Sequence, residues 1–88
     1  GTIENAYTLS DGEYEVIEAE IIETSELINK EIKNSNLPDE LRIGAVLRDK
    51  KIIIPRSNFV FKKDDRVVFI VKKDSISFVE NIFRLSSV

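Results

Sequence analysis

The chain has 88 residues, a formal net charge of −3 and 42% hydrophobic residues, enough for one small domain with a modest core. It contains no Cys and no His, which excludes disulfides, thiolate metal sites and a histidine general base. No apolar run approaches the ~20 residues that span a bilayer. These features favour a non-catalytic cytoplasmic domain without a metal site. A carboxylate-based enzyme would instead depend on Glu18 or Glu20.

Charge is distributed unevenly along the chain. Residues 1–26 hold eight acids and no Lys or Arg, whereas residues 27–88 hold thirteen bases and eight acids, so the two parts carry −8 and +5. A solvated acidic strand face explains this split. The alternative is that the acidic face pairs with the basic part of a second copy. The acidic balance and the absence of an RNA-binding motif argue against nucleic acid as a partner.

The first predicted elements alternate in hydrophobicity. Residues 1–13 are predicted to be a loose linker or lead-in that ends after the Asp11-Gly12 turn, and residues 14–88 form the domain. Residues 14–22 alternate with a period of two, which predicts a strand with Ile17, Ala19 and Ile21 on its buried side. Leu27, Ile28 and Ile32 then follow at a spacing that predicts a short helix, ending at residues 34–36.

The second half of the chain predicts a hairpin, a central strand and a helix. Residues 41–48 alternate, residues 49–51 form a tight polar connection, and residues 52–54 return as the second hairpin strand. Residues 66–71 are almost continuously apolar, which is typical of a central strand covered on both faces. Apolar residues at 76, 79, 82 and 83 predict an amphipathic final helix. The predicted fold is α+β, a small mostly antiparallel sheet with helices in the order β-α-β-β-β-α.

Three lysine doublets stand at predicted strand ends. If the strands at 41–48 and 66–72 run in the same direction, the doublets at 50–51 and 72–73 share one end of the sheet and the doublet at 62–63 lies at the other. Two converging doublets could attract an anion. The alternative is that lysines simply occupy wet strand ends. The chain has no glycine-rich dinucleotide or triphosphate loop.

Five segments of the chain resemble segments of a known family. They are residues 14–21 (YEVIEAEI), Leu37-Pro38, residues 42–49 (RIGAVLRD), residues 52–56 (IIIPR) and residues 65–69 (DRVVF). Their succession resembles the C-terminal domain of regulators of potassium conductance, called TrkA-C or RCK-C, over roughly residues 14–85. One departure is Asp64, which stands where the family often has Gly.

The resemblance implies a regulatory role in potassium transport. Domains of this family follow a nucleotide-binding Rossmann domain, so any nucleotide cofactor is expected on that separate upstream domain. They form homodimers at the inner face of the cell membrane, where a membrane potassium transporter subunit is the partner, and ligand binding biases its gate. In some relatives the ligand is a cyclic dinucleotide. The alternative is the same module attached to a different membrane transporter or exchanger.

Five residues are predicted to line a ligand-binding cleft between two copies: Arg42, Ile43, Ile54, Pro55 and Arg56. The arginines would meet anionic groups, and the apolar residues would meet flat apolar groups. Ile43 and Ile54 could equally be plain core residues, and Arg42 and Arg56 could be solvated.

Overall fold

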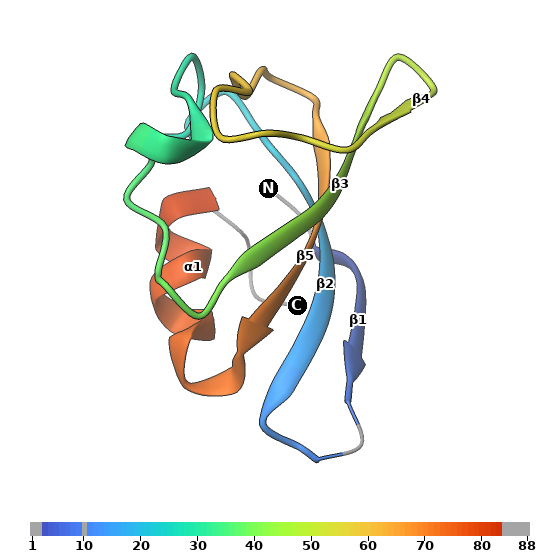
Figure 1. The fold of residues 1–88 in the computed structure, drawn as a ribbon, viewed down its shortest axis with the longest axis vertical. Coiled ribbons are helices and arrows are strands. Elements are labelled where there is room, and N and C mark those ends of the chain that lie inside the picture. The colour runs from blue at the N-terminus through green and yellow to red at the C-terminus, as the bar shows by residue number, and fades with distance from the viewer. Residues whose placement is uncertain (1–2, 10, 84–88) are drawn as a thin grey trace.

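The computed structural model describes residues 3–9 and 11–83, and it folds them into one five-stranded antiparallel sheet with helical segments on one face (Figure 1). The strand order is β1-β2-β5-β3-β4. The strands are β1 (Ile3–Thr8), β2 (Tyr14–Glu20), β3 (Arg42–Arg48), β4 (Lys51–Ile53) and β5 (Arg66–Lys72). The helices are the 3-10 turns η1 (Ile32–Asn34) and η2 (Lys73–Ser75) and the α-helix α1 (Ile76–Phe83). The predicted α+β class is therefore confirmed.

The element order differs from the prediction at the N-terminus. Residues 3–8 were expected to be loose, but β1 pairs with β2 in antiparallel register, with Tyr7 opposite Val16. Gly12, at a φ of 74°, helps the chain reverse between the two strands. Short, partly polar edge strands carry a weak sequence signal, because one side of the strand never meets the core.

The helix predicted after Ser25 is wrong. Residues 23–29 form turns, and only the short η1 turn follows. The reason is competition for backbone hydrogen bonds, since the Ile32 amide donates to the Phe59 carbonyl and the Phe61 amide donates to the Lys30 carbonyl. Residues 29–33 thus pair through their backbone with residues 57–61 instead of forming a helix. The apolar residues of the predicted helix still face inward, with Leu27 only 1% exposed.

Strand β3 contains a bulge that changes which side chains face the core. The register with β5 shifts between Ile43 and Ala45. The predicted alternation therefore holds only up to Ile43, and beyond the bulge Val46 turns inward and is fully buried. A bulge adds one residue to one strand, so every later side chain changes face. Period-two reasoning could not detect this extra residue.

The core lies between the sheet and α1. It combines the inward residues of β2 and β5, including Ile17, Ala19, Phe69 and Val71, with the apolar stripe of the helix. The Phe69 and Phe83 rings stack with centroids 5.1 Å apart. The strand β5 is central, as predicted, but it is not covered on both faces within residues 3–9 and 11–83, because Ile70 on its outward side is 42% exposed.

Candidate ligand-binding site

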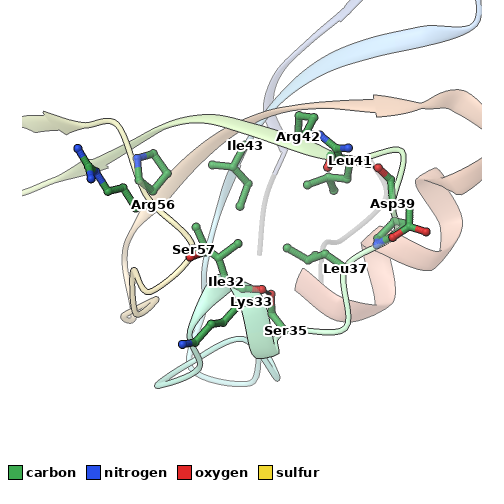
Figure 2. A pocket seen from close by; sticks show the side chains of 12 residues that line it. Ile32, Lys33, Ser35, Leu37, Asp39, Leu41, Arg42, Ile43, Arg56 and Ser57 are labelled. Carbon is green, nitrogen blue, oxygen red and sulfur yellow. Dashed lines mark hydrogen bonds between the residues drawn. The ribbon is translucent and has the colours of Figure 1, made fainter.

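A cleft of about 400 Å³ opens between the η1 segment and the start of β3 (Figure 2). One wall comes from residues 32–39, and the other comes from residues 41–43 and 55–57. The walls are joined at one end, because the Lys33 amide donates to the Ser57 carbonyl over 2.9 Å. A cavity of this size falls within the range that binds small molecules in proteins, about 300–1,000 Å³.

Four of the five residues that were predicted to line a cleft between two copies line this cleft within one copy, and their role in ligand binding stays a prediction. Arg42, Ile43, Pro55 and Arg56 come together there, although Arg42 and Ile43 are separated in sequence from Pro55 and Arg56 by the whole β3–β4 hairpin. Ile54 does not line the cleft. It is 74% exposed, so it is not a core residue either.

The cleft has an apolar interior and a cationic rim. In Figure 2 the side chains of Ile32, Leu37 and Ile43 point into the hollow. Arg56 and Lys33 lie above and below one side of it, with their charged ends pointing away from the hollow, and the Arg42 side chain lies near Asp39 at the other side. The lining holds three bases and one acid, a local charge of +2, in a chain whose net charge is −3. This arrangement fits a ligand with anionic groups and a flat apolar part.

The Arg42 side chain is already partly engaged. Its guanidinium donates to the backbone carbonyls of Asp39 and Leu41. These bonds tie β3 to the 38–41 turn and hold the guanidinium at the rim, where its remaining N–H groups can still donate.

The loop that supplies Pro55 and Arg56 is held by an ion pair between the partly exposed Arg48 and the buried Asp65. Arg48, at the end of β3, donates to both carboxylate oxygens of Asp65 over 2.7 and 2.6 Å, and to the Val60 carbonyl over 2.9 Å. Its guanidinium also lies 4.8 Å from the centre of the Phe59 ring. The hydrogen bond to Asp65 raises the pKa of Arg48 above its usual value, against the opposing effect of desolvation. The arginine therefore stays charged, and the loop is fixed to the sheet at both its middle and its end.

The Asp65 carboxylate is held by one further hydrogen bond besides those from Arg48. It is 1% exposed, and one of its oxygens also accepts a hydrogen bond from the Lys62 amide over 2.8 Å. Buried carboxylates need such partners because an unpaired charge in the interior is very costly. Sequence reasoning did not assign Arg48 or Asp65 any role, although both stand in the segments that resemble the TrkA-C family.

Other cleft residues were also missed at the sequence level. Leu37 was named only among the segments that resemble the family, and Ile32 was assigned to the predicted helix, yet both line the cleft. Ser57 carried no signal at all. The contact between the 32–39 and 55–57 segments depends on the pairing of residues 29–33 with residues 57–61, and this pairing follows no local pattern.

The prediction about converging lysine doublets is wrong. Strand β5 runs antiparallel to β3, so Lys50–Lys51 and Lys62–Lys63 lie toward one end of the sheet and Lys72–Lys73 lie at the other. The last pair borders a smaller cavity of about 250 Å³ with residues Gly12, Glu13 and Asp74. No doublet meets a second one across the candidate cleft.

Glu18, on the acidic face of β2, is one of the two carboxylates on which a carboxylate-based enzyme would depend. Glu18 lies 3.8 Å from the Arg66 guanidinium, measured between Oε2 and Nε, so it takes part in an ion pair. Among residues 3–9 and 11–83, no three acidic, His or Cys side chains gather in a group that could hold a metal ion. In the same described ranges, no helix is both long and apolar enough to cross a lipid bilayer.

Curated proteins with similar sequences share one description. The chain is 40% identical over 86 residues to the Trk system potassium uptake protein TrkA of Azorhizobium caulinodans, a match over 98% of this chain and 19% of that protein. It is 31% identical over 77 residues to a TrkA homolog of Archaeoglobus fulgidus, over 88% of this chain and 18% of that protein. The chain thus spans about a fifth of the length of the curated relatives it matches.

Solved structures share the fold. One, "Structure of RCK domain with cda", has a TM-score of 0.68 and 13% identity over 77% of this chain and 96% of that chain. Another, the "RCK_C domain dimer of S.agalactiae BusR in complex with c-di-AMP", has a TM-score of 0.66 and 24% identity over 76% and 92%. At these identities the likeness shows a common architecture. A family model described as the TrkA-C domain matches residues 16–84, and the chain therefore belongs to the TrkA-C domain family.

Proposed function

We propose that this chain is a non-catalytic, ligand-binding regulatory domain of a Trk-type potassium uptake protein. It acts by pairing with a second copy and by binding a small anionic ligand in the cleft between η1 and β3. The observation that carries this proposal is the cleft itself, because its lining combines the cationic residues Lys33, Arg42 and Arg56 with apolar side chains.

The likeness to other proteins supports the proposed ligand class. Two structural neighbours are described as bound to "cda" or to c-di-AMP, and one of them is a dimer. A cyclic dinucleotide combines two phosphates with two flat bases. Arg56, Arg42 and Lys33 could meet the phosphates, while Ile43, Pro55 and Leu37 could contact a base. The curated relatives favour a Trk system over a different transporter.

A ligand can regulate only if it binds two arrangements of the protein with different affinity. In this proposal the ligand favours one arrangement of the paired domains, and that arrangement biases the gate of a membrane potassium transporter. The domain would work on the cytoplasmic side of the membrane. Any nucleotide cofactor would sit on a separate upstream Rossmann domain, and the cleft would lie near the contact between copies.

The proposal is tested by thermal unfolding with cyclic di-AMP as the probe, with ATP and Mg²⁺ in parallel. A ligand at 100 times its dissociation constant should stabilise the fold by about 2.7 kcal/mol, which raises the melting temperature by roughly 11–22 °C for a domain of this size. The absence of a shift with every probe would contradict the ligand-binding part of the proposal.

Two matched variants localise the binding. Arg56→Ala should weaken cyclic di-AMP binding about tenfold or more, because a hydrogen bond to a charged group contributes roughly 1.5–3 kcal/mol. Lys51→Ala removes another exposed base, on the β4 strand and outside the cleft, and should leave the affinity unchanged. Calorimetric titration measures both. Equal effects from the two variants would mean that the ligand senses only overall charge.

A further inference from the structure

The β3–β4 hairpin extends away from the rest of the sheet, and β4 forms one edge of that sheet (Figure 1). Two isoleucines on this edge face water, since Ile52 is 72% exposed and Ile54 is 74% exposed. Among residues 3–9 and 11–83 they are the two most exposed large apolar side chains. A single exposed apolar side chain on a protein surface is ordinary. Two of them close together on one sheet edge indicate a surface that a partner covers.

The two isoleucines lie on the same face of the strand. Ile53 packs against the core, and side chains alternate between the two faces along a strand, so Ile52 points away from the core. Ile54 stands two residues further on and is held extended by the proline at position 55, so it points to the same side. Lys51 lies on the opposite face, together with Ile53. The edge therefore has an apolar face and a face that carries a cation.

The outer edge of β4 also presents backbone groups. Asp49 and Lys50 form a two-residue turn with φ angles of 52° and 67°, and Arg48 lies opposite Lys51. In a hairpin of this kind the pair that flanks the turn exchanges both backbone hydrogen bonds, and the next pair exchanges none. The Ile52 N–H and C=O therefore point away from β3. In the part of the chain that the structure describes, no backbone hydrogen bond from outside the β3–β4 ladder reaches Ile52.

An extended polypeptide strand matches both features of this edge. Its backbone can hydrogen-bond with the Ile52 amide and carbonyl, while its alternate side chains contact the two isoleucines. A lipid surface would cover the isoleucines but would leave the outward N–H and C=O without partners. Strand β4 is short, and Pro55 follows it closely, which limits the number of backbone bonds that a partner can form. The side chains of the partner must therefore provide most of the selectivity.

Charge indicates the chemistry of that partner. Residues 49–56 hold three bases and one acid, a net of +2, in a chain of net charge −3. A strand that places apolar side chains beside Ile52 and Ile54 places its intervening side chains on the other face, beside Lys51. Acidic residues at those positions would meet a cation. This chain has such an alternation in β2, but both edges of β2 are already paired, with β1 and with β5, so β2 of a second copy cannot supply the added strand.

We infer that the outer edge of β4 is a docking site for an extended segment of another protein in which apolar and acidic residues alternate. The site is distinct from the ligand cleft, because neither Ile52 nor Ile54 lines that cleft. The inference therefore goes beyond the proposed function and does not depend on it. Because β4 continues directly into Pro55 and Arg56, which do line the cleft, a bound partner would lie beside it.

Selection of random dodecapeptides displayed on phage against the unchanged chain tests the inference. The expected result is enrichment of peptides in which Val, Ile or Leu alternates with Glu or Asp. In fluorescence anisotropy, the double variant Ile52→Ser and Ile54→Ser should bind the enriched peptides roughly tenfold or more weakly, because two apolar contacts are lost. Phe78→Ser, at a 46% exposed site on α1, should bind them unchanged. Circular dichroism confirms that each variant is folded.

A charge exchange tests the acidic part of the inference. Lys51→Glu should weaken binding of the enriched peptides and should restore it for the same peptides with Lys in place of Glu and Asp. The proposal is overturned if no peptide is enriched, or if the enriched peptides bind the double variant as tightly as the unchanged chain. Sedimentation equilibrium and cosedimentation with phosphatidylglycerol vesicles check the other occupants. Self-association or vesicle binding that the double variant abolishes would assign this edge to a second copy or to a lipid surface, and would overturn the proposed partner.

Discussion

Substitution of Arg48 and substitution of Asp65 should lower the free energy of unfolding by very different amounts, although each breaks the same ion pair. The Asp65 side chain is 1% exposed, whereas the Arg48 side chain is 31% exposed. Arg48→Met leaves a buried carboxylate without its cation. Asp65→Asn leaves a guanidinium that water can reach. The two variants therefore remove the same ion pair but leave unequal groups behind.

The magnitudes follow from this difference. Breaking a buried ion pair so that one charge stays buried costs roughly 3–5 kcal/mol, so Arg48→Met should lose that amount. Asp65→Asn keeps a side-chain oxygen for the Lys62 amide and should lose about 1–3 kcal/mol, as expected for lost hydrogen bonds whose remaining partner is hydrated. Because a small domain has only about 0.05–0.15 kcal/mol of stability per residue, Arg48→Met should bring the domain close to unfolding.

Urea unfolding followed by far-ultraviolet circular dichroism measures both losses at one protein concentration. Constant slopes against denaturant would confirm that the variants change stability rather than the unfolded state. The reasoning would be refuted if Asp65→Asn cost as much as Arg48→Met, since the exposure of the remaining group would then not matter.

Two further predictions concern single side chains. Lys50→Gly should stabilise the fold by about 0.5–1 kcal/mol, because Lys50 adopts a φ of 67° in the β3–β4 turn and only glycine adopts this conformation without strain; differential scanning calorimetry should show a higher melting temperature, and a lower one would contradict the turn geometry. Ser25→Ala should destabilise by about 1–3 kcal/mol, because the buried Ser25 hydroxyl donates to the Ile82 carbonyl and accepts from the Leu27 amide. Urea unfolding measures this loss, and an unchanged midpoint would mean that these two bonds contribute nothing.

The sequence predicts the periodic parts of the fold well. Strand β2, the β3–β4 hairpin and helix α1 each combine a clear period with a local turn or ending signal, so local rules determine them. The bulge after Ile43 and the loss of the predicted helix depend on partners distant in the sequence. Asp64 is an instructive case, because it stands where the family often has Gly and has a φ of 72°, so the backbone keeps a glycine-like conformation without the glycine.

The candidate site was only partly predictable. The resemblance predicted Arg42, Ile43, Pro55 and Arg56 as site residues. A family resemblance indicates which separate segments lie close together, whereas a periodic pattern describes only one segment. The 32–39 wall of the cleft could not be predicted, because it reaches the site through backbone bonds such as that between the Lys33 amide and the Ser57 carbonyl. These contacts exist only once the chain has folded.

The most direct test of the proposed function is an NMR titration of the ¹⁵N-labelled chain with cyclic di-AMP. The account predicts saturable shifts that are largest for the amides of Leu37, Ile43, Arg56 and Ser57, all in the cleft. It predicts much smaller shifts near Lys73, which does not line the cleft. The absence of saturable shifts up to millimolar ligand, or shifts centred on Lys73, would contradict the claim that this cleft is a regulatory ligand site.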